Sequence, residues 1–336
     1  MKIIHIPKNV GGNPYLISKY SDNNVIESEV WVLENNNYDY SANKFIFSKD
    51  DNFFLREFKK LLALNYIFKC NIVFYNYGTS LYSPYFTLDL DNYSYWKVPF
   101  ISIYCLYTRF MSWVELGIVK IRKVSIFIQY QGDDARQGDY QKENFKINIA
   151  NEVDKFYYSK KTDLMKRKQI KLFGRIAKKI YSLNPDLMHV LPKKTEFLPY
   201  MIEDLKQIKP SFLNLDSRIL KIGHAPSNRD VKGTRFILDA VKKLQEEKLP
   251  FEFILIENLT HEEALNEYSK IDVLVDQLLA GWYGGLAVEV MSLGKPVVAY
   301  IREEDLDFIP KKMKEDIPII NSDPESIYSC LKKLIF

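Results

Sequence analysis

The stretch "KIGHAPSNRDVKGTRFILDAVKKL", residues 221–244, joins a short apolar run, a polar loop and a helical pattern. The apolar run predicts a buried strand, and the apolar spacing after the loop predicts a helix. Arg229 and Lys232 lie three positions apart just before that helix, so both side chains can point the same way. Because the N-terminus of a helix attracts anions, we expect the pair to bind a diphosphate. A solvated basic loop is the alternative.

The same alternation of strands and helices extends along the chain on both sides of this stretch. The first half shows strand patterns at 2–7, 29–33, 71–76, 124–130 and 179–184, with helical patterns at 54–69 and 100–117. The second half shows strands at 218–225, 251–257, 272–277 and 295–301, with helices at 232–248, 260–271 and 284–294. This pattern predicts an α/β fold of two Rossmann-like domains facing across a cleft, with ligands beyond the carboxyl ends of the strands.

The length of 336 residues exceeds what one compact core usually holds. The stretch "KKTEFLPYMIEDLKQIKP", residues 193–210, is rich in proline and charge and is interpreted as the linker region. We therefore expect an acceptor domain over 1–200, a nucleotide-sugar domain over 201–322 and a C-terminal helix over 323–336. That last helix could pack back on the N-terminal domain.

Composition indicates a soluble protein of ordinary charge. Lys and Arg number 47 and Asp and Glu 43, a net charge of +4, which gives no reason to expect a nucleic-acid partner. The three cysteines are widely spaced, which argues against a disulfide framework or a zinc site and fits a reducing compartment. Neither a secretory segment nor a bilayer-spanning run is recognisable, so the sequence predicts a cytoplasmic protein.

A glycine-rich stretch, "GWYGGLAVEVMSLGKPVVAY" at 281–300, supplies a second candidate cluster. Gly284 and Gly285 open a predicted helix and would let backbone approach a ligand phosphate, with Leu286 next to them in its first turn. Glu289 lies on the same face one turn inside and could accept hydrogen bonds from two ribose hydroxyls. A carboxylate on an apolar helix is costly unless something satisfies it. The alternative is a Glu capped by backbone or paired with a nearby Lys.

These two stretches together are similar to the C-terminal domain of family 4 of the retaining glycosyltransferases, which have the GT-B fold. The segments "VGGNPYLIS" at 10–18 and "YQGDDARQ" at 130–137 resemble other signature loops of that family, in the same order along the chain. The resemblance implies a UDP-sugar or GDP-sugar donor held mainly by the second domain. It also implies that Arg229 and Lys232 bind the diphosphate and that Glu289 binds the ribose.

The resemblance has implications for the first domain too. Gly11 and Gly12 would let backbone approach the donor, although a plain turn is the alternative. Asp133 is the candidate for touching a sugar or acceptor hydroxyl, and an Asx-type turn is its alternative. The resemblance also implies an enzyme that works without a metal ion, so we expect no metal ion and no cofactor besides the donor.

The chain departs from the family at two positions. The family's Glu-x7-Glu pattern would place an acid eight residues before Glu289, where this chain has Gly281. Asp276 and Gln277 are possible substitutes, and Asp276 could equally cap the end of its strand. In the middle loop Gln131 stands where relatives often have a histidine, and a glutamine cannot shuttle protons near neutrality.

A basic segment from Lys160 to Lys179 contains nine Lys or Arg residues and one acid. Its apolar residues fall at helical spacing beneath the basic face: Phe173, Ile176, Ala177 and Ile180. One interpretation is adhesion to an anionic membrane at its inner face, where each cation contributes about 1 kcal/mol. The alternative is an ordinary Rossmann helix with a solvated outer side.

Together these features predict a retaining, hexosyltransferase-like glycosyltransferase of polysaccharide biosynthesis. It would move a sugar from a nucleotide-diphosphate donor to a hydroxyl of a glycan or lipid-linked acceptor, with Arg229 and Lys232 stabilising the departing diphosphate. Two alternatives remain: a non-catalytic scaffold that partners another subunit, and a sugar-nucleotide epimerase, which can share the fold.

Overall fold

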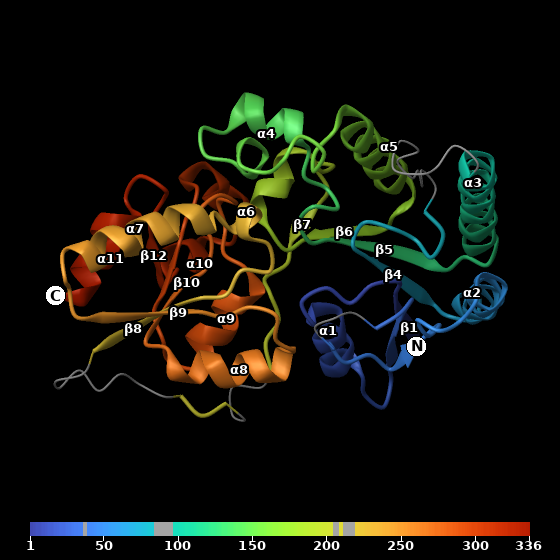
Figure 1. Ribbon diagram of the computed structural model, residues 1–336. Coiled ribbons are helices and arrows are strands. Elements are labelled where there is room, and N and C mark those ends of the chain that lie inside the picture. Colours follow the sequence, from blue (N-terminus) through green and yellow to red (C-terminus); the bar gives the residue numbers. More distant parts are fainter. Residues whose placement is uncertain (36–38, 84–96, 204–207, 211–218) are drawn as a thin grey trace. The chain divides into compact units, whose positions relative to one another are not determined.

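The computed structural model describes residues 1–35, 39–83, 97–203, 208–210 and 219–336. The chain forms two compact units, each built around its own parallel sheet (Figure 1). The first unit holds most of residues 1–136 together with Lys161–Leu198, and the second holds Gln137–Lys160 and Pro199–Phe336. The prediction of two Rossmann-like α/β units is confirmed.

The first unit contains a seven-stranded sheet in the order β3-β2-β1-β4-β5-β6-β7. All of its strand pairs are parallel. Its elements are β1 (Lys2–Ile6), α1 (Asn13–Ser21), β2 (Glu27–Val32), β3 (Lys44–Phe45), α2 (Phe53–Ile67), β4 (Ile72–Asn76), α3 (Val98–Ile121), β5 (Ser125–Tyr130), α5 (Lys160–Ile176), β6 (Lys179–Ser182), a 3-10 turn (Pro185–His189) and β7 (Glu196–Phe197).

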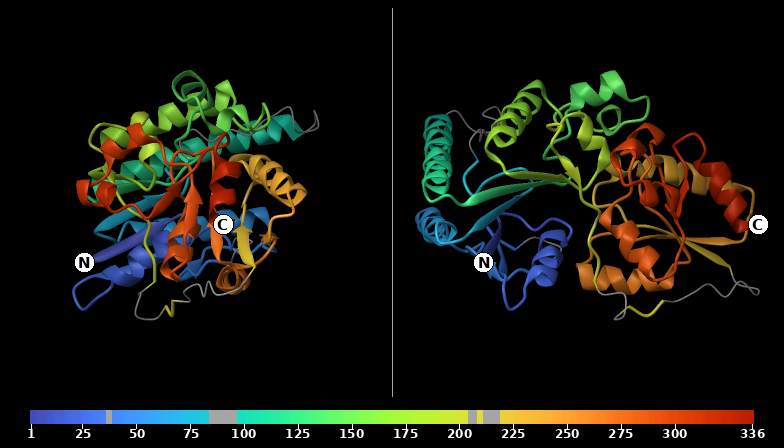
Figure 2. Two further views of the ribbon diagram at one scale, coloured as in Figure 1. Left: turned by 90° about the vertical axis from the view of Figure 1, so that its left-hand side faces the viewer. Right: turned by 180° about the vertical axis from the view of Figure 1, so that it is seen from behind.

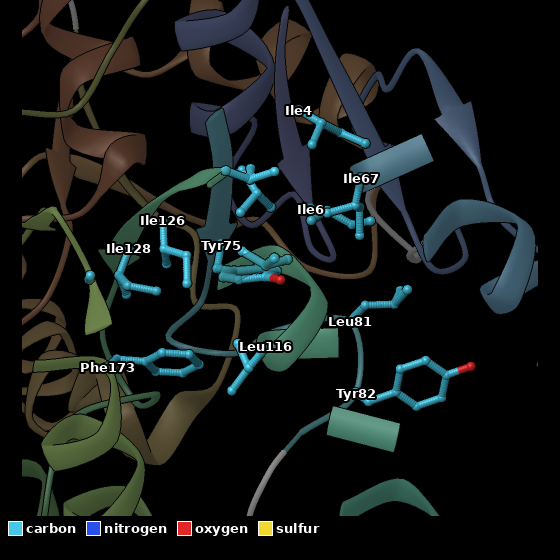
Figure 3. Close-up of a cluster of buried hydrophobic side chains, with 14 of the residues drawn as sticks. Ile4, Ile6, Ile67, Tyr75, Leu81, Tyr82, Leu116, Ile126, Ile128 and Phe173 are labelled. Atoms are coloured by element: carbon cyan, nitrogen blue, oxygen red, sulfur yellow. The ribbon is translucent and has the colours of Figure 1, made fainter. Parts of the chain in front are cut away.

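One face of this sheet carries the main apolar core of the first unit. Alternate residues of each strand point to the same side of a sheet, and here those residues are isoleucine, valine and tyrosine. Helices α2, α3 and α5 cover this face with Ile67, Leu116 and Phe173, which lie against the strands in Figure 3. The three helices therefore lie along one side of the sheet and turn their other sides to solvent.

The second unit contains a five-stranded parallel sheet in the order β12-β11-β10-β8-β9. Its elements are α4 (Gly138–Asn144), a 3-10 turn (Ile149–Asn151), β8 (Leu220–His224), α6 (Arg229–Lys232), α7 (Thr234–Glu246), β9 (Phe251–Leu255), α8 (His261–Lys270), β10 (Val273–Val275), α9 (Gly285–Ser292), β11 (Val297–Ala299), a 3-10 turn (Glu303–Phe308), α10 (Lys311–Glu315), β12 (Ile319–Asn321) and α11 (Ile327–Ile335).

Residues 137–160 precede the boundary expected near residue 200, yet they belong to the second unit. Two contacts of Arg302 attach them there. Its guanidinium lies 3.7 Å from the ring centre of Phe145 and donates to the backbone oxygen of Ile147. Ile149 is fully buried in a small apolar cluster with Leu279 and Ala280. Hydrophobic packing and a cation–π contact thus attach residues 137–160 to the second unit, although the segments before and after them in the chain belong to the first.

The C-terminal helix α11 packs on α7 of the second unit. Ile327 and Leu331 are buried in the core of that unit, and Lys332 pairs with Glu247 at the end of α7. This finding replaces the expectation that the helix packs back on the N-terminal domain, because its apolar face is already covered here. Among the described residues, no helix has both the length and the apolar character needed to cross a bilayer.

Candidate functional site

The second sheet reverses its strand order between β8 and β10. The connection after β8 leads outward to β9 on one side, and β10 lies on the other side. Parallel α/β sheets bind ligands at such a point, beyond the carboxyl ends of the two strands. The residues that follow His224 at the end of β8 and Val275 at the end of β10 therefore define the candidate site.

A three-membered cluster occupies this edge of the sheet. Lys232 Nζ donates to Asp276 Oδ1 over 2.7 Å, and the backbone N–H of Gly284 donates to Asp276 Oδ2 over 2.6 Å. The Asp276 side chain is fully buried, and that of Lys232 is 12% exposed. The carboxylate thus links the ammonium of Lys232 to the N-terminus of helix α9.

The loop before α7 positions Lys232. The helix expected at 232–248 is observed as α7, and Gly233, with a left-handed φ of 74°, separates it from the one-turn helix α6 that ends at Lys232. A methyl group at Gly233 would lie 3.1 Å from the closest atom of Leu279, and it would also be strained at that φ. The backbone oxygen of Lys232 accepts from Leu278 N, which ties the turn to the end of β10.

Arg229 starts the one-turn helix α6 and points to a different partner. Its Nε and Nη2 atoms donate to the two carboxylate oxygens of Glu257, over 2.8 and 2.5 Å. The Arg229 side chain is 55% exposed. The N–H groups of Asp230 and Val231 at the start of α6 are taken by the Asn228 side chain. Arg229 and Lys232 are therefore neighbours in sequence, but each is bound to its own carboxylate.

His224 is a structural residue between the two ion pairs. Its Nδ1 donates to the backbone oxygen of Val275 over 2.7 Å, and its Nε2 accepts from Thr234 Oγ1 over 2.8 Å. Burial, together with the charge of Lys232, lowers the pKa of His224 to about 4, so the ring is neutral near pH 7. This neutral histidine has a hydrogen bond at each ring nitrogen. It fixes the ends of β8 and β10 and is not available for proton transfer.

Glu289 lies on α9 and is bound to His261, the first residue of α8. His261 Nε2 and Glu289 Oε1 are 2.8 Å apart, and both side chains are partly exposed. The hydrogen bond from Glu289 raises the pKa of His261 above its usual value. The carboxylate is therefore satisfied by a histidine, a partner different from the backbone or lysine that the sequence suggested.

The start of α9 leaves room around the Lys232–Asp276 pair. A methyl group on Gly284 would lie 3.2 Å from Lys232 Nζ and 3.4 Å from Asp276 Oδ2, which is tighter than an ordinary contact. A methyl group on Gly285 would meet only the Tyr200 ring at 3.5 Å. Leu286 is half-buried in the first helical turn. Gly284 is thus the glycine whose missing side chain keeps the ammonium accessible.

The position where the family has its first acid is filled by a cation. Gly281 has a left-handed φ of 78°, and a methyl group there would lie 2.7 Å from the Arg302 guanidinium. Arg302 is itself buried and paired with Asp305 over 2.8 Å. Neither proposed substitute is free to replace the acid. Asp276 is held by Lys232, and the Gln277 amide donates to the backbone oxygen of Trp282.

In the first unit, Gly11 and Gly12 form the turn from β1 into α1. Their φ angles are 62° and 68°, which glycine adopts without strain. Gly12 is the residue that caps α1, and a methyl group on Gly11 would meet nothing within 4 Å. Both glycines lie where this sheet reverses its order between β1 and β4. The turn interpretation therefore accounts for their conformation.

The loop after β5 is held by Asp134, whose side chain binds backbone N–H groups two and three residues earlier in the chain. Its carboxylate accepts from the backbone N–H groups of Gln131 and Gly132, and burial raises its pKa to about 6. The neighbouring Asp133 is partly exposed and lies 3.6 Å from Arg136, which also pairs with Asp186. The loop is thus organised by the acid next to the one singled out in the sequence.

The sequence analysis assigned no role to Glu257 or to His261. Both lie just beyond the carboxyl end of β9, which is the edge of the sheet where ligands bind. The signal for Glu257 was a charged residue at the end of the strand predicted at 251–257, whereas His261 lies six residues after β9, at the start of α8. No group of His, Cys, Asp and Glu side chains that could hold a metal ion occurs in the parts of the chain that the structure describes.

No protein-family model matches this sequence. No curated protein matches it either. Solved structures do match its fold over almost the whole chain. An alpha-glucosyltransferase in complex with UDP-glucose and DNA containing an abasic site has a TM-score of 0.53 and 11% identity, covering 99% of this chain and 89% of the other.

Two further structures are similar. Sucrose-phosphate synthase from Thermosynechococcus elongatus has a TM-score of 0.51 and 12% identity, covering 100% of this chain and 90% of that one. A UDP-GlcNAc 2-epimerase from Neisseria meningitidis bound to UDP-GlcNAc has a TM-score of 0.48 and 12% identity, covering 100% and 91%. The chain has the GT-B fold, as its sequence predicted.

Replacing Gly281 with Ala is expected to destabilise the protein by about 1–3 kcal/mol, because the methyl group is strained at this φ and meets the buried Arg302. Chemical denaturation measures the change. Gly285→Ala is the matched control, since its methyl group finds ordinary contact distances. Equal stability of both variants would show that the buried position of Arg302 does not require the space beside Gly281.

Proposed function

We propose that the second unit binds a nucleoside-diphosphate sugar and that the protein transfers the sugar to a hydroxyl of a glycan or lipid-linked acceptor. Retention of the anomeric configuration is part of the proposal and rests on the family resemblance. The observation that supports it most is the ammonium of Lys232 at the N-terminus of α9, at the point where the strand order reverses.

The cluster retains donors for an anion. A lysine ammonium has three N–H donors, and the described contacts of Lys232 use one of them on Asp276. The first turn of α9 adds backbone N–H groups and the positive end of the helix dipole. Gly284 has no side chain to block the approach. A diphosphate oxygen can therefore reach both the ammonium and the helix N-terminus.

The charges of the unliganded site are balanced. Lys232 is paired with Asp276, and Arg229 with Glu257, so two cations face two carboxylates. A diphosphate must compete with these carboxylates or share their donors. We infer that this balance keeps the affinity for the intact nucleotide-sugar donor moderate. The cations then interact more strongly with the negative charge that develops on the diphosphate as the sugar–phosphate bond breaks.

Glu289 is the candidate for the ribose. Its second oxygen and its partial exposure leave it able to accept from a diol, while His261 holds the first oxygen. The departing phosphate would itself take the acceptor proton in the front-face mechanism that the resemblance implies. No protein nucleophile is then needed.

One observation favours a non-catalytic member of this fold. Arg302 occupies the space where relatives have a sugar-facing acid, and the structure offers no other free carboxylate among the residues named at this site. Such a protein would bind the nucleotide sugar without turning it over. The titratable His261–Glu289 pair is the feature that an epimerase could use instead.

Product analysis distinguishes the three activities. We expect UDP- or GDP-sugar to release nucleotide only when a hydroxyl acceptor is added, as measured by chromatography and NMR. A new epimer without acceptor would identify an epimerase, and binding without any product would identify a scaffold. Lys232→Gln should lower turnover roughly 100-fold. The double variant Lys232→Gln/Asp276→Asn, which leaves no buried charge unpaired, separates lost activity from misfolding.

Asp276→Asn should have two opposite effects on thermal stability. The melting temperature of the free protein should fall, since the mostly buried ammonium of Lys232 loses its counter-charge, at a cost of about 1–3 kcal/mol. UDP should then raise the melting temperature more than it does for the original protein, because the phosphate supplies the missing charge. If the nucleotide-induced rise is the same or smaller, the phosphate does not bind at Lys232.

Binding of a nucleotide sugar should weaken as pH falls through the raised pKa of His261. Protonated His261 competes with the ribose hydroxyls for the negative charge of the Glu289 carboxylate; this competition is strongest at low pH and is lost as pH rises through the raised pKa. The diphosphate of a nucleotide sugar is esterified at both ends, so it does not itself titrate between about pH 5.5 and 8.5. Calorimetry should show the dependence, and His261→Gln should flatten it. If binding to the His261→Gln variant depends on pH as strongly as binding to the original protein does, Glu289 does not contact the ligand.

A further inference from the structure

Helices α2 and α3 expose large apolar side chains along their outer sides. The set on α2 is Phe53, Phe54, Leu55, Phe58, Leu61 and Leu62, and the set on α3 is Phe100, Ile103, Leu106, Phe110, Trp113 and Ile121. The exposed fractions are large, 82% for Phe54 and 75% for Phe100. Soluble proteins rarely leave so many aromatic and aliphatic residues together in water unless they form an interaction surface.

The exposed residues on α3 are arranged as a regular stripe. Phe100, Ile103, Leu106, Phe110 and Trp113 recur every three or four positions, so they share one side of the helix. The opposite side, with Leu116 and Val119, is buried against the sheet. Both sides of α3 are therefore apolar, whereas a helix that only covers a sheet has a polar outer side.

The two helices are fixed side by side, as Figures 1 and 2 show. Glu57 of α2 is buried and accepts from the hydroxyls of Tyr104 and Tyr107 of α3, over 3.4 and 3.1 Å. The rings of Phe53 and Tyr104 meet edge to face at 5.4 Å. These contacts join the stripes of α2 and α3 into one apolar surface.

The exposed charges on helices α2, α3 and α5 themselves are of one sign. Helices α2, α3 and α5 contain one acidic residue each, Glu57, Glu115 and Asp163, and all three are buried. The exposed charged residues on these helices and at the ends of α3 are cations: Lys97, Lys120, Arg122 and Lys123 at the ends of α3, and Lys160, Lys161, Arg167, Lys168, Lys171 and Arg175 on α5.

The basic helix α5 supplies charge without supplying the apolar contact. In the apolar stripe expected beneath its basic face, Phe173 and Ala177 are buried in the core, and only Ile176 is exposed. Ile180, expected on the same helix, is buried on strand β6. The apolar stripe predicted in the sequence thus faces the sheet. Since α2, α3 and α5 cover the same face of that sheet, the cations of α5 lie on the same side of the first unit as the apolar stripes of α2 and α3.

We propose that the outer sides of α2, α3 and α5 form a docking surface for a lipid bilayer with anionic headgroups. The apolar stripes enter the boundary between headgroups and acyl chains, with Trp113 at the interface, while the cations of α3 and α5 contact lipid phosphates. An apolar centre bordered by cations, with the acids of all three helices turned inward, matches the chemistry of such a membrane.

A second copy of the chain fits this surface poorly. A two-fold dimer places the same patch of both copies face to face, so cations of one copy would border cations of the other. The three helices expose no carboxylate that could pair with them.

Vesicle co-sedimentation of the full chain tests the proposal. The protein should bind vesicles of mixed phosphatidylcholine and phosphatidylglycerol, and bind pure phosphatidylcholine at least about tenfold more weakly at low salt. Phe100→Ser/Phe110→Ser/Trp113→Ser should lower the vesicle partition coefficient at least about tenfold at any salt. Lys168→Gln/Lys171→Gln/Arg175→Gln should lower it by a similar factor only at low salt.

Matched controls use equally exposed residues elsewhere in the chain. Val25→Ser/Phe156→Ser/Phe336→Ser removes exposed apolar surface outside the three helices, and Lys242→Gln/Lys243→Gln/Lys312→Gln removes exposed cations. Both should leave vesicle binding unchanged, and melting temperatures check that every variant is folded. The proposal is overturned if the original protein ignores anionic vesicles at low salt, or if the test and control variants bind alike. It is also overturned if the apolar variant loses only self-association in sedimentation velocity.

Discussion

The hydrogen-bonded bridge Lys232–Asp276–Gly284 is the interaction on which the candidate site depends. It ties the turn after β8 to the end of β10 and to the residue that precedes α9, and these three elements meet where the strand order reverses. A fully buried carboxylate is stable there because both of its oxygens are satisfied. The same bridge holds an ammonium at a helix N-terminus, so the constraint that stabilises the second unit also prepares a place for an anion.

The site differs from that of its relatives in a way that follows from packing. Arg302 attaches residues 137–160 to the second unit through Phe145 and Ile147, and its guanidinium fills the space beside Gly281. A carboxylate cannot occupy that space without displacing the arginine. Gly281, at the position of the first acid in the family that the sequence resembles, is thus part of how the second unit is assembled.

Periodicity and strand–helix alternation were enough to predict both parallel sheets, since each element carries its own apolar pattern. The sequence also placed Lys232, Gly284 and the turn at Gly11 and Gly12 at the correct edges of their sheets. It could not pair Arg229 with Glu257 or Glu289 with His261, because these contacts join segments 28 residues apart whose geometry depends on loops. The exposed stripes of α2 and α3 were missed for a related reason. A helix that is apolar on both sides is read as buried, and only the structure shows which side the sheet covers.

The decisive measurement is the structure of the protein with bound UDP, and specifically the distance from Lys232 Nζ to the nearest phosphate oxygen. We predict a hydrogen bond of about 2.7–3.2 Å, with the same phosphate within reach of the N–H groups that begin α9. A nucleotide bound elsewhere, with the Lys232–Asp276 bridge intact and no phosphate contact to Lys232, would contradict the proposed role of this site.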